Sequence, residues 1–393
     1  MTPGGPPGRR ILANLHCEDE WAGGRRTLGK AALSTAAAAG TLLRAFAREG
    51  DRLWLPAPVD PGRMAAVPGL PVPEIETGPL AALPPAGAVL TWGATSTVIL
   101  SEAKDLGGGA LSREAGEGWG GGPLHDLLWH LPPPPPEVAS AVHHRGFCLR
   151  VAESLGFALP GARMVASLAD LETLLAAPGA PRSWVVKAPL SAAGRDRYVG
   201  REGVCLDDPA ARRAVAGLFR RFGRLLFEPW MERTDDFGCA ALLLPDGELR
   251  VVSFHRQLVD RRGQFLGIEL AASFAGLEGL SEEERGRMET ALSGVAEALR
   301  EAGYHGPFGI DAWQYRSANG SLVLHPLGEI NARMTFGLVA RALVDRLREP
   351  LELAGTVRLR FGREVPRGAG VVALLHPGGE PPMAAWIEPA GAA

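Results

Sequence analysis

Three polar side chains alternate along one short stretch of this chain, and they constrain its fold more than any other feature. Glu329, Asn331 and Arg333 lie two residues apart in the run His-Pro-Leu-Gly-Glu-Ile-Asn-Ala-Arg. In a β-strand, residues at this spacing point to the same face. The pattern therefore predicts a strand that presents an acid, an amide and a guanidinium together, a combination suited to binding a ligand.

A second strand with a single acid is expected to pair with the first. Asp311 stands in the otherwise apolar run Phe-Gly-Ile-Asp-Ala-Trp-Gln-Tyr, and residues 318–321, Ala-Asn-Gly-Ser, predict the turn of a hairpin. The pairing would place Asp311 beside Glu329 and Asn331. Mg²⁺ typically takes one or two carboxylates plus substrate phosphates, so the three residues predict a site for nucleotide-bound Mg²⁺. An edge hairpin with a solvated polar face is the simpler alternative.

Lysine is rare in this chain, which draws attention to each lysine that is present. Of 41 basic residues, only Lys30, Lys104 and Lys187 are lysine. Lys187 ends a buried-looking strand and precedes a loop of small residues. The N–H groups of this loop, together with Arg195 or Arg197, can lie over phosphates. A lysine at the end of a strand is also commonly a surface residue with a buried stem.

A segment between these elements predicts a strand, then an extended proline-containing connector, then a second strand from Cys239. Such a connector can offer main-chain groups to a flat heterocycle, with Trp230 or Met231 as an apolar wall and Asp235 or Asp236 for ribose hydroxyls. An ordinary loop between strands is the alternative.

The order of these parts resembles the ATP-grasp superfamily. Residues 185–195, Val-Val-Lys-Ala-Pro-Leu-Ser-Ala-Ala-Gly-Arg, are similar to the family's strand lysine and glycine-rich loop over the phosphates. Residues 227–231, Phe-Glu-Pro-Trp-Met, are similar to the linker between the two ATP-grasp lobes. Residues 309–311 and 329–333 resemble the paired metal-binding strands. The resemblance covers about residues 140–345.

The resemblance implies a role for each matching residue, with ATP and either Mg²⁺ or Mn²⁺ as cofactors. Asp311, Glu329 and Asn331 would hold the metal ion, and Arg333 would lie near the γ-phosphate. Asp236 would replace the usual ribose-binding glutamate, and Arg145 the second phosphate lysine of many members. The residues expected to bind the nucleotide are Arg145, Lys187, Ser191, Gly194, Arg195, Glu228, Trp230, Met231 and Asp236.

The chemistry that the resemblance implies is ATP-dependent ligation. A carboxylate is activated as an acyl phosphate, and an amine displaces phosphate to give an amide or peptide bond, with release of ADP. Arg256 alternates out of an apolar strand and is predicted to act with Arg333 in catalysis by holding the acyl phosphate or the substrate carboxylate. A surface role for Arg256 is the alternative, and His255 is expected to pack on the opposite side.

Two rival functions share these parts. A phosphotransferase of ATP-grasp architecture would pass the γ-phosphate to a hydroxyl group or a carrier histidine. A non-catalytic ATP-binding module would typically have lost its metal ligands, whereas all three are present in this sequence. The expected substrates are a small carboxylic acid and an amine, such as an amino acid or a short peptide, and a homodimer is left open.

Composition agrees with a cytoplasmic enzyme. The chain has 393 residues, of which 46% are hydrophobic and 22% charged, enough for a large core. A formal net charge of −3 gives no reason to expect nucleic acid or an acidic membrane as a partner. No apolar stretch approaches the ~20 residues of a membrane span. The four cysteines are scattered without metal-ligand spacing, which predicts reduced thiols.

Strand and helix alternate in the N-terminal part. Strands are expected at 11–15, 52–55 and 88–92, with an alanine-rich helix over 28–49, which together predict a Rossmann-like α/β unit. In such sheets ligands lie at the carboxyl ends of strands, so residues 16–21 and 92–95 are candidates for lining a substrate cleft.

The chain is therefore predicted to combine α/β and α+β parts. A Rossmann-like domain comes first, and two α+β lobes that clasp ATP follow it. A glycine-rich flexible insertion and a proline linker are expected within or after the first domain. After the linker a single helix is expected over 139–155, and Ser281 with Glu284 predicts a capping box at the start of a helix that runs to about residue 302. The predicted boundaries are 1–136 for the N-terminal domain, with the insertion at 101–122 and the linker at 132–136, 137–230 for the small lobe, 231–350 for the large lobe, and 351–393 for a β-rich tail.

Overall fold

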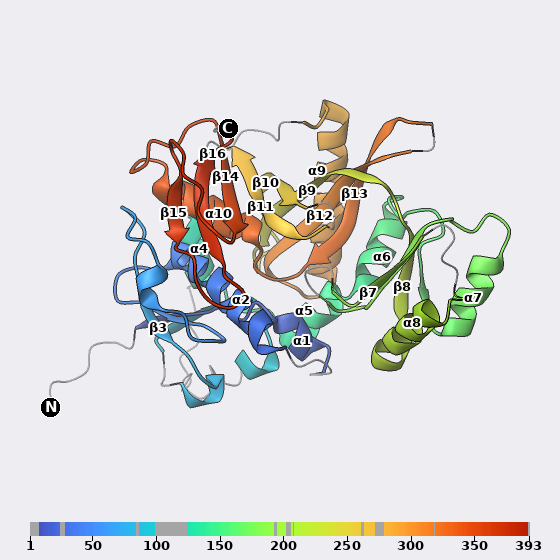
Figure 1. The fold of residues 1–393 in the computed structure, drawn as a ribbon, viewed down its shortest axis with the longest axis horizontal. Helices are drawn as coiled ribbons and strands as arrows, with labels where there is room; N and C mark the ends of the chain where they lie inside the picture. Colours follow the sequence, from blue (N-terminus) through green and yellow to red (C-terminus); the bar gives the residue numbers. More distant parts are fainter. Residues whose placement is uncertain are drawn as a thin grey trace.

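A computed structural model describes the chain over residues 8–23, 28–83, 86–98, 124–191, 195–201, 206, 208–260, 263–271, 279–317 and 319–391. Within these ranges the strands form a parallel sheet and two antiparallel sheets (Figure 1). The predicted insertion at 101–122 lies outside the described residues. No helix in the described ranges is long and apolar enough to cross a membrane.

The N-terminal sheet is parallel, with the order β3-β2-β1-β4. The three strands expected from the sequence are confirmed, and β3 is an additional short strand. The predicted alanine-rich helix is shorter than expected, since it ends as a 3-10 helix. The elements are β1 (Arg9–Leu12), β2 (Arg52–Trp54), β3 (Glu74–Glu76), β4 (Ala88–Thr91), α1 (Cys17–Trp21), α2 (Lys30–Gly40), η1 (Thr41–Phe46), η2 (Pro61–Arg63), η3 (Leu80–Ala82) and α4 (Leu124–His130).

Two helices follow, where a single one was expected at 139–155. They are α5 (Pro136–His143) and α6 (Arg145–Ser154), and the break falls at His144. The backbone of His144 is extended, and its ring Nδ1 accepts a hydrogen bond from the N–H of Gly146 at 2.9 Å. An N-cap of this kind starts a new helix, which the apolar periodicity alone does not reveal.

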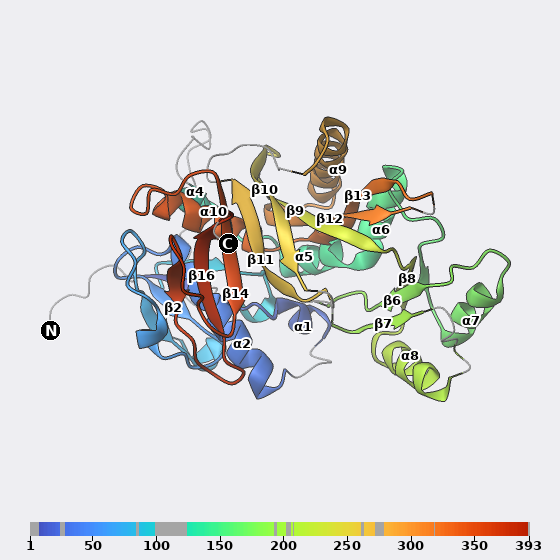
Figure 2. The ribbon, with the colours of Figure 1, turned by 45° about the horizontal axis from the view of Figure 1, so that its top comes forward.

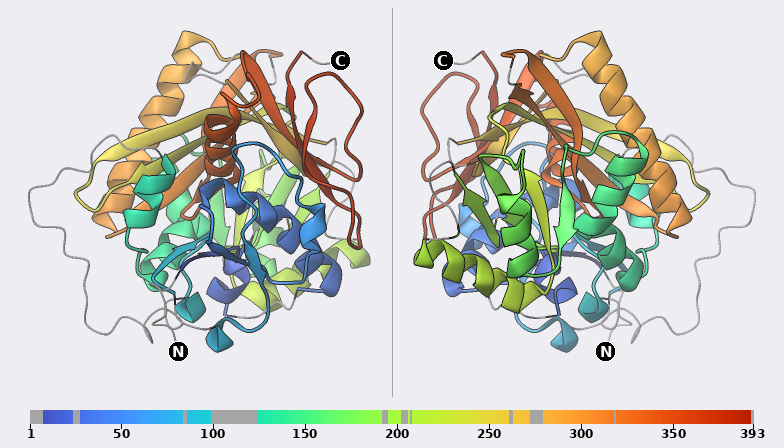
Figure 3. Two further views of the ribbon diagram at one scale, coloured as in Figure 1. Left: turned by 90° about the vertical axis from the view of Figure 1, so that its left-hand side faces the viewer. Right: turned by 90° about the vertical axis from the view of Figure 1, so that its right-hand side faces the viewer.

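The second sheet forms a separate lobe with its own core. Its antiparallel order is β5-β8-β6-β7, and α7 and α8 pack against it (Figure 3, right). Gly200 is required beside Trp184, because a Cβ at Gly200 would lie 2.1 Å from the indole ring. The elements are β5 (Arg163–Val165), α7 (Leu168–Ala176), β6 (Trp184–Lys187), β7 (Arg197–Gly200), α8 (Pro209–Phe222) and β8 (Leu225–Pro229).

The third sheet has the order β13-β12-β9-β10-β11-β14-β16-β15, with every neighbouring pair antiparallel. The predicted C-terminal β-rich tail therefore continues this sheet. Helix α9 begins with the expected capping box, since Ser281 and Glu284 bond each other's N–H groups. The elements are β9 (Arg233–Leu243), β10 (Leu249–Val259), β11 (Phe265–Ala271), α9 (Glu282–Glu301), β12 (Gly306–Arg316), β13 (Leu322–Asn331), α10 (Phe336–Leu347), β14 (Thr356–Gly362), β15 (Val372–Leu375) and β16 (Ala384–Pro389).

One hydrophobic core joins the N-terminal domain to this large sheet. It contains Leu42 and Phe46 from η1 together with Leu338 and Leu343 from α10. Figure 2 shows β14 and β16 beside the N-terminal domain, with the small lobe at the other end of the molecule. The fully buried Arg44 reinforces the junction, because its Nη2 donates to carbonyl oxygens of both parts, 2.9 and 3.0 Å away. The two parts are therefore held as one packed body.

Buried histidines make the stability of this body depend on pH. Burial lowers the pKa of His255, in β10, to about 4. The unfolded chain takes up a proton below about pH 6.5, whereas the folded chain does not until about pH 4. Stability is therefore expected to fall as the pH drops from 6.5 to 4, by up to about 1.4 kcal/mol per pH unit for this histidine.

This expectation is checked by urea unfolding of His255→Asn between pH 4.5 and 8. The variant should show a shallower loss of stability on acidification, since one proton-uptake site is gone. His376→Asn, changed at an exposed position, serves as the control. An unchanged slope in His255→Asn would contradict the expectation.

Candidate functional site

The predicted hairpin exists and brings the acids together. β12 and β13 are antiparallel neighbours, and their register places Asp311 directly opposite Glu329. Asn331 lies opposite Gly309, two residues further along the same pair of strands. The Nδ2 of Asn331 donates to Oδ2 of Asp311 at 3.1 Å. The three residues predicted to hold a metal ion are therefore neighbours.

A fourth polar side chain completes this group. The Nε2 of Gln257, in β10, donates to Oδ1 of Asp311 at 2.6 Å. Gln257 was not among the residues predicted from the sequence, whereas the adjacent Arg256 was. Adjacent strand residues point to opposite faces, and the register pairs Arg256 with Phe237, which lies in the core beneath α9. The structure therefore does not bring Arg256 to the other site residues; its recorded ion pair is with Asp235, at 3.5 Å.

The pKa values of the two acids are shifted in opposite directions from their usual values. Burial and the neighbouring Glu329 raise the pKa of Asp311 to about 6, although its bonds from Gln257 and Asn331 oppose the shift. Burial alone would raise the pKa of Glu329 as well, but Arg145 and other nearby cations hold it below its usual value. Two carboxylates this close repel each other, so the arrangement favours a cation between them.

Arg145 joins the site from the N-terminus of α6. Its Nη2 donates to Oε1 of Glu329 at 2.8 Å, and its Nη1 donates to Oγ of Ser191 at 2.8 Å. The same Nη1 donates to the carbonyl of Ala188 at 2.5 Å. Ser191 in turn donates to the carbonyl of Arg195 at 3.2 Å. Arg145, Ser191 and the backbone of Arg195 are thus brought together, while Gly194 lies outside the described residues.

Lys187, at the end of β6, also has an acidic partner. Its Nζ lies 2.5 Å from Oε2 of Glu228 in the neighbouring strand β8, and both side chains are largely buried. The ring of Trp313 lies 5.8 Å from the same Nζ, and its own Nε1 is buried with no hydrogen-bond partner among the described residues. Trp313 thus lies beside the candidate site, and sequence reasoning missed it because an indole in an apolar strand gives no signal of its own.

The connector between β8 and β9 is shorter than the sequence suggested, since β9 already begins at Arg233. The N–H of Trp230 donates to the carbonyl of Ser183 at 2.8 Å, and Met231 follows it, half-buried. Asp236 accepts from Nη1 of Arg233 at 3.0 Å and lies opposite Trp313 in the sheet. The structure therefore places Asp236 on the same strand face as Trp313.

Arg333 lies beyond the end of β13, where the N-terminal domain meets the large sheet. Its Nη2 donates to Oδ1 of Asn331 at 3.1 Å, and its guanidinium lies 5.3 Å from the centre of the Trp92 ring. The N–H of Met334 donates to the carbonyl of Trp92 at 2.8 Å. The loop at 92–95, expected to line a substrate cleft, therefore contacts the segment that follows β13, the strand predicted to bind the metal ion.

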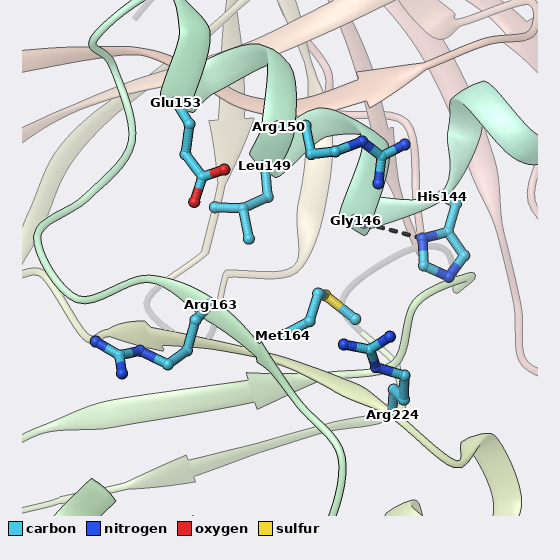
Figure 4. Close-up of a pocket in the computed structure, with 8 residues that line it drawn as sticks. All are labelled: His144, Gly146, Leu149, Arg150, Glu153, Arg163, Met164 and Arg224. Atoms are coloured by element: carbon cyan, nitrogen blue, oxygen red, sulfur yellow. Dashed lines mark hydrogen bonds between the residues drawn. The ribbon is translucent and has the colours of Figure 1, made fainter.

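A hollow of about 390 Å³ lies beside α6 (Figure 4). It contains none of the predicted site residues, although His144 and Gly146 border Arg145 in the chain. Its lining residues are His144, Gly146, Leu149, Arg150, Glu153, Arg163, Met164 and Arg224.

The residues present fit a magnesium ion. Among the described residues there is no cluster of three or more His, Cys, Asp or Glu side chains, so a site made only of such ligands is not found there. Two facing carboxylates and an amide match Mg²⁺ that is shared with substrate phosphates. The amide oxygen of Asn331 accepts one hydrogen bond from Arg333, and its second lone pair could bind the ion while that bond is kept.

Comparisons with known proteins bear on the fold. No family model matches the chain, and no curated protein matches it. Among solved structures, biotin carboxylase from Campylobacter jejuni, in a complex with β,γ-ATP, has a TM-score of 0.55 and 15% identity. The match covers 97% of this chain and 87% of that one.

Two further structures are N5-carboxyaminoimidazole synthetase from Staphylococcus aureus, complexed with ADP, and N5-carboxyaminoimidazole ribonucleotide synthetase from Thermus thermophilus. Their TM-scores are 0.53 and 0.51 and their identities 8% and 15%. The matches cover 98% and 97% of this chain and 93% of each of those. The parallel N-terminal sheet and the two antiparallel sheets correspond to those of these enzymes, so the chain has the ATP-grasp fold, preceded by a Rossmann-like domain.

Proposed function

We propose that this protein is an ATP-dependent, ADP-forming enzyme that ligates a carboxylate to an amine through an acyl phosphate. The observation that carries the proposal is the register of β12 and β13, which sets Asp311 opposite Glu329 within reach of Arg145. Lys187 supplies a second cation from the small lobe. Carboxylates for a metal ion and cations for phosphates thus face one another between the two lobes.

The proposed reaction needs positioning more than a protein nucleophile. A carboxylate oxygen of the substrate attacks the γ-phosphorus, and the bond to the β-phosphate oxygen breaks, releasing ADP. The amine then attacks the acyl carbon, loses a proton, and displaces phosphate. Phosphoryl transfer of this kind is catalysed mainly by alignment and charge neutralisation. Mg²⁺, when bound, would supply neutralisation of charge on the β- and γ-phosphates.

The roles of individual residues follow from their positions. Lys187 and Arg145 each lie against a carboxylate, which offsets part of the cost of burying the cation. Each cation is proposed to keep that partner and to contact a phosphate group as well when the nucleotide binds. Ser191 and Arg195 belong to the proposed phosphate loop, and Asn331 to the metal site. In this proposal the nucleotide base would lie against Trp230, Met231 and Trp313, with Glu228 beside it and Asp236 at the ribose.

The names of the matched structures suggest a further carboxylate substrate to be tested. One is a carboxylase and two are carboxyaminoimidazole synthetases, so each name refers to a carboxyl group. Bicarbonate therefore belongs among the candidate carboxylates for this chain, together with amino acids and short peptides. A phosphotransferase is the second function to be tested, because it would use the same nucleotide residues.

Product analysis separates these functions. Purified protein is supplied with Mg-ATP, bicarbonate or an amino acid as the acid, and a panel of amines. A ligase should release ADP and free phosphate in equal amounts, with one adduct formed per ADP, detected by mass spectrometry. A phosphorylated product without free phosphate would show a phosphotransferase and contradict the ligase proposal.

Binding of Mg-ATP is expected to depend on Lys187. Lys187→Ala removes a cation from the proposed phosphate site and leaves Glu228 buried without its partner, so affinity should fall by about 2–5 kcal/mol. Isothermal titration calorimetry measures the loss. Lys30→Ala, at an exposed position of α2, is the matched control and should bind as the wild type does. Equal affinities in all three proteins would remove Lys187 from the phosphate site.

Catalysis is expected to depend on Glu329. Glu329→Gln keeps size and hydrogen-bonding capacity but removes the charge proposed to hold the metal ion. ADP release should fall by at least about two orders of magnitude, as for the loss of a strong transition-state contact, while nucleotide still binds. Glu297→Gln, at an exposed ion pair of α9, controls for the substitution itself. Normal turnover by Glu329→Gln would overturn the proposed metal site.

A further inference from the structure

The N-terminal domain places a buried carboxylate at the edge of the candidate site. Glu18, in α1, has a side chain that is only 1% exposed. Its Oε1 accepts from Nε of Arg333 at 2.5 Å and lies 3.8 Å from Nε2 of His143. The Nδ1 of His143 accepts from the N–H of Ala332 at 3.2 Å. Glu18 therefore reaches the segment that follows the metal-binding strand both directly and through His143.

A continuous chain of hydrogen bonds leads from Glu18 to the proposed metal ligands. Arg333 donates to Glu18, to the carbonyl of Met334 at 2.9 Å, and to Oδ1 of Asn331 at 3.1 Å. Asn331 then donates to Asp311 at 3.1 Å. Since three of the five guanidinium N–H groups are already engaged, the orientation of Arg333 is fixed by protein groups.

The segment that carries Glu18 is itself held firmly. Nε1 of Trp21, one turn further along α1, donates to the carbonyl of Ala94 at 2.9 Å, and Nδ2 of Asn14 donates to that of Gly93 at 2.8 Å. Cys17 packs so closely on Gly93 that a Cβ there would lie 2.5 Å from Sγ. The carboxylate of Glu18 thus has little freedom to adapt its position.

Holding the domains together does not require this ion pair. A hydrophobic core already joins the N-terminal domain to the large sheet, as Phe46 and Leu343 illustrate. Burying two charges is costly, and replacing such a pair by apolar residues is often neutral or stabilising. Stability alone is therefore a weak reason for Glu18 and Arg333, whereas the hydrogen bonds to Asn331 point toward the metal site.

We propose that Glu18 is a positioning residue, through which the N-terminal domain orients Arg333, Asn331 and Asp311 for metal binding. The inference rests on the proposed function, since it takes Asn331 and Asp311 as metal ligands. Partners in the outer shell of a metal site orient the ligands, and their loss typically costs 10–100-fold in metal affinity or activity. Glu18 acts on the reaction through Arg333 and needs no contact with substrate.

The test measures the Mg²⁺ dependence of two variants. Glu18→Gln keeps the shape of the side chain but leaves Arg333 without its counter-charge. It should raise the Mg²⁺ concentration for half-maximal ADP release, and weaken Mn²⁺ binding to the ADP complex followed by electron paramagnetic resonance, each by on the order of 10- to 100-fold. The KM for ATP at saturating Mg²⁺ should change little. Glu18→Asp, which keeps the charge, should recover part of the loss.

A matched control separates positioning from stability. Asp51→Asn breaks another buried ion pair of the N-terminal domain, Arg9–Asp51 at 2.7 Å, which lies away from the metal-binding strands. Its Mg²⁺ dependence should equal that of the wild type even if its melting temperature falls. An equal Mg²⁺ shift in Asp51→Asn and Glu18→Gln would overturn the proposal, because a general loss of stability would then explain both.

Two further outcomes keep the inference distinct from the proposed function. Wild-type Mg²⁺ dependence in Glu18→Gln, with Glu329→Gln inactive, would overturn the positioning role and leave the function intact; activity in Glu329→Gln would overturn the function itself. If Glu18→Gln does not fold, the double variant Glu18→Gln, Arg333→Gln removes both charges. Its Mg²⁺ shift should match that of Arg333→Gln alone, whereas a Mg²⁺ dependence equal to that of the wild type would contradict the proposal.

Discussion

Repulsion between two facing carboxylates is the constraint on which the rest of the site depends. Asp311 and Glu329 are forced opposite each other by the pairing of β12 with β13, and burial makes that repulsion stronger. The surrounding groups reduce this repulsion. Arg145 offsets the charge of Glu329, and Gln257 donates to Asp311. A divalent cation would offset the remaining negative charge of the two carboxylates. The arrangement therefore suits metal-bound phosphates.

Separate hydrophobic cores divide the molecule into two parts, and each part contributes residues to the candidate site. The N-terminal domain and the large sheet share one hydrophobic core, so Glu18 keeps a fixed position relative to β12 and β13, the strands of the proposed metal site. The small lobe has a separate core around Trp184 and Phe227, and it contributes Lys187. The proposed metal ligands are thus held in the larger body and one proposed phosphate-binding cation in the smaller, so that a nucleotide between them would contact both.

Much of this arrangement could be predicted, since it depends on local patterns. Alternation in residues 329–333 and the single acid at Asp311 predicted the hairpin and its register, because strand side chains repeat every two residues. The capping box at Ser281 located the start of α9. One local pattern misled, because the apolar periodicity of 139–155 hid the N-cap at His144. The role predicted for Arg256 stays a prediction, and the register places this residue on the strand face opposite that of Gln257.

The order of residues alone specifies which side chains share a strand face and which loops follow which strands. The tertiary packing decides which other residues those strand faces contact. Sheet register turned Gln257 toward Asp311 and Arg256 toward the core beneath α9, although the two residues are adjacent. Glu18 and Arg333 lie far apart in the sequence, and no pattern links them. Their contact exists because a shared hydrophobic core fixes one domain against the other, and long-range packing of that kind leaves no periodic trace in the chain.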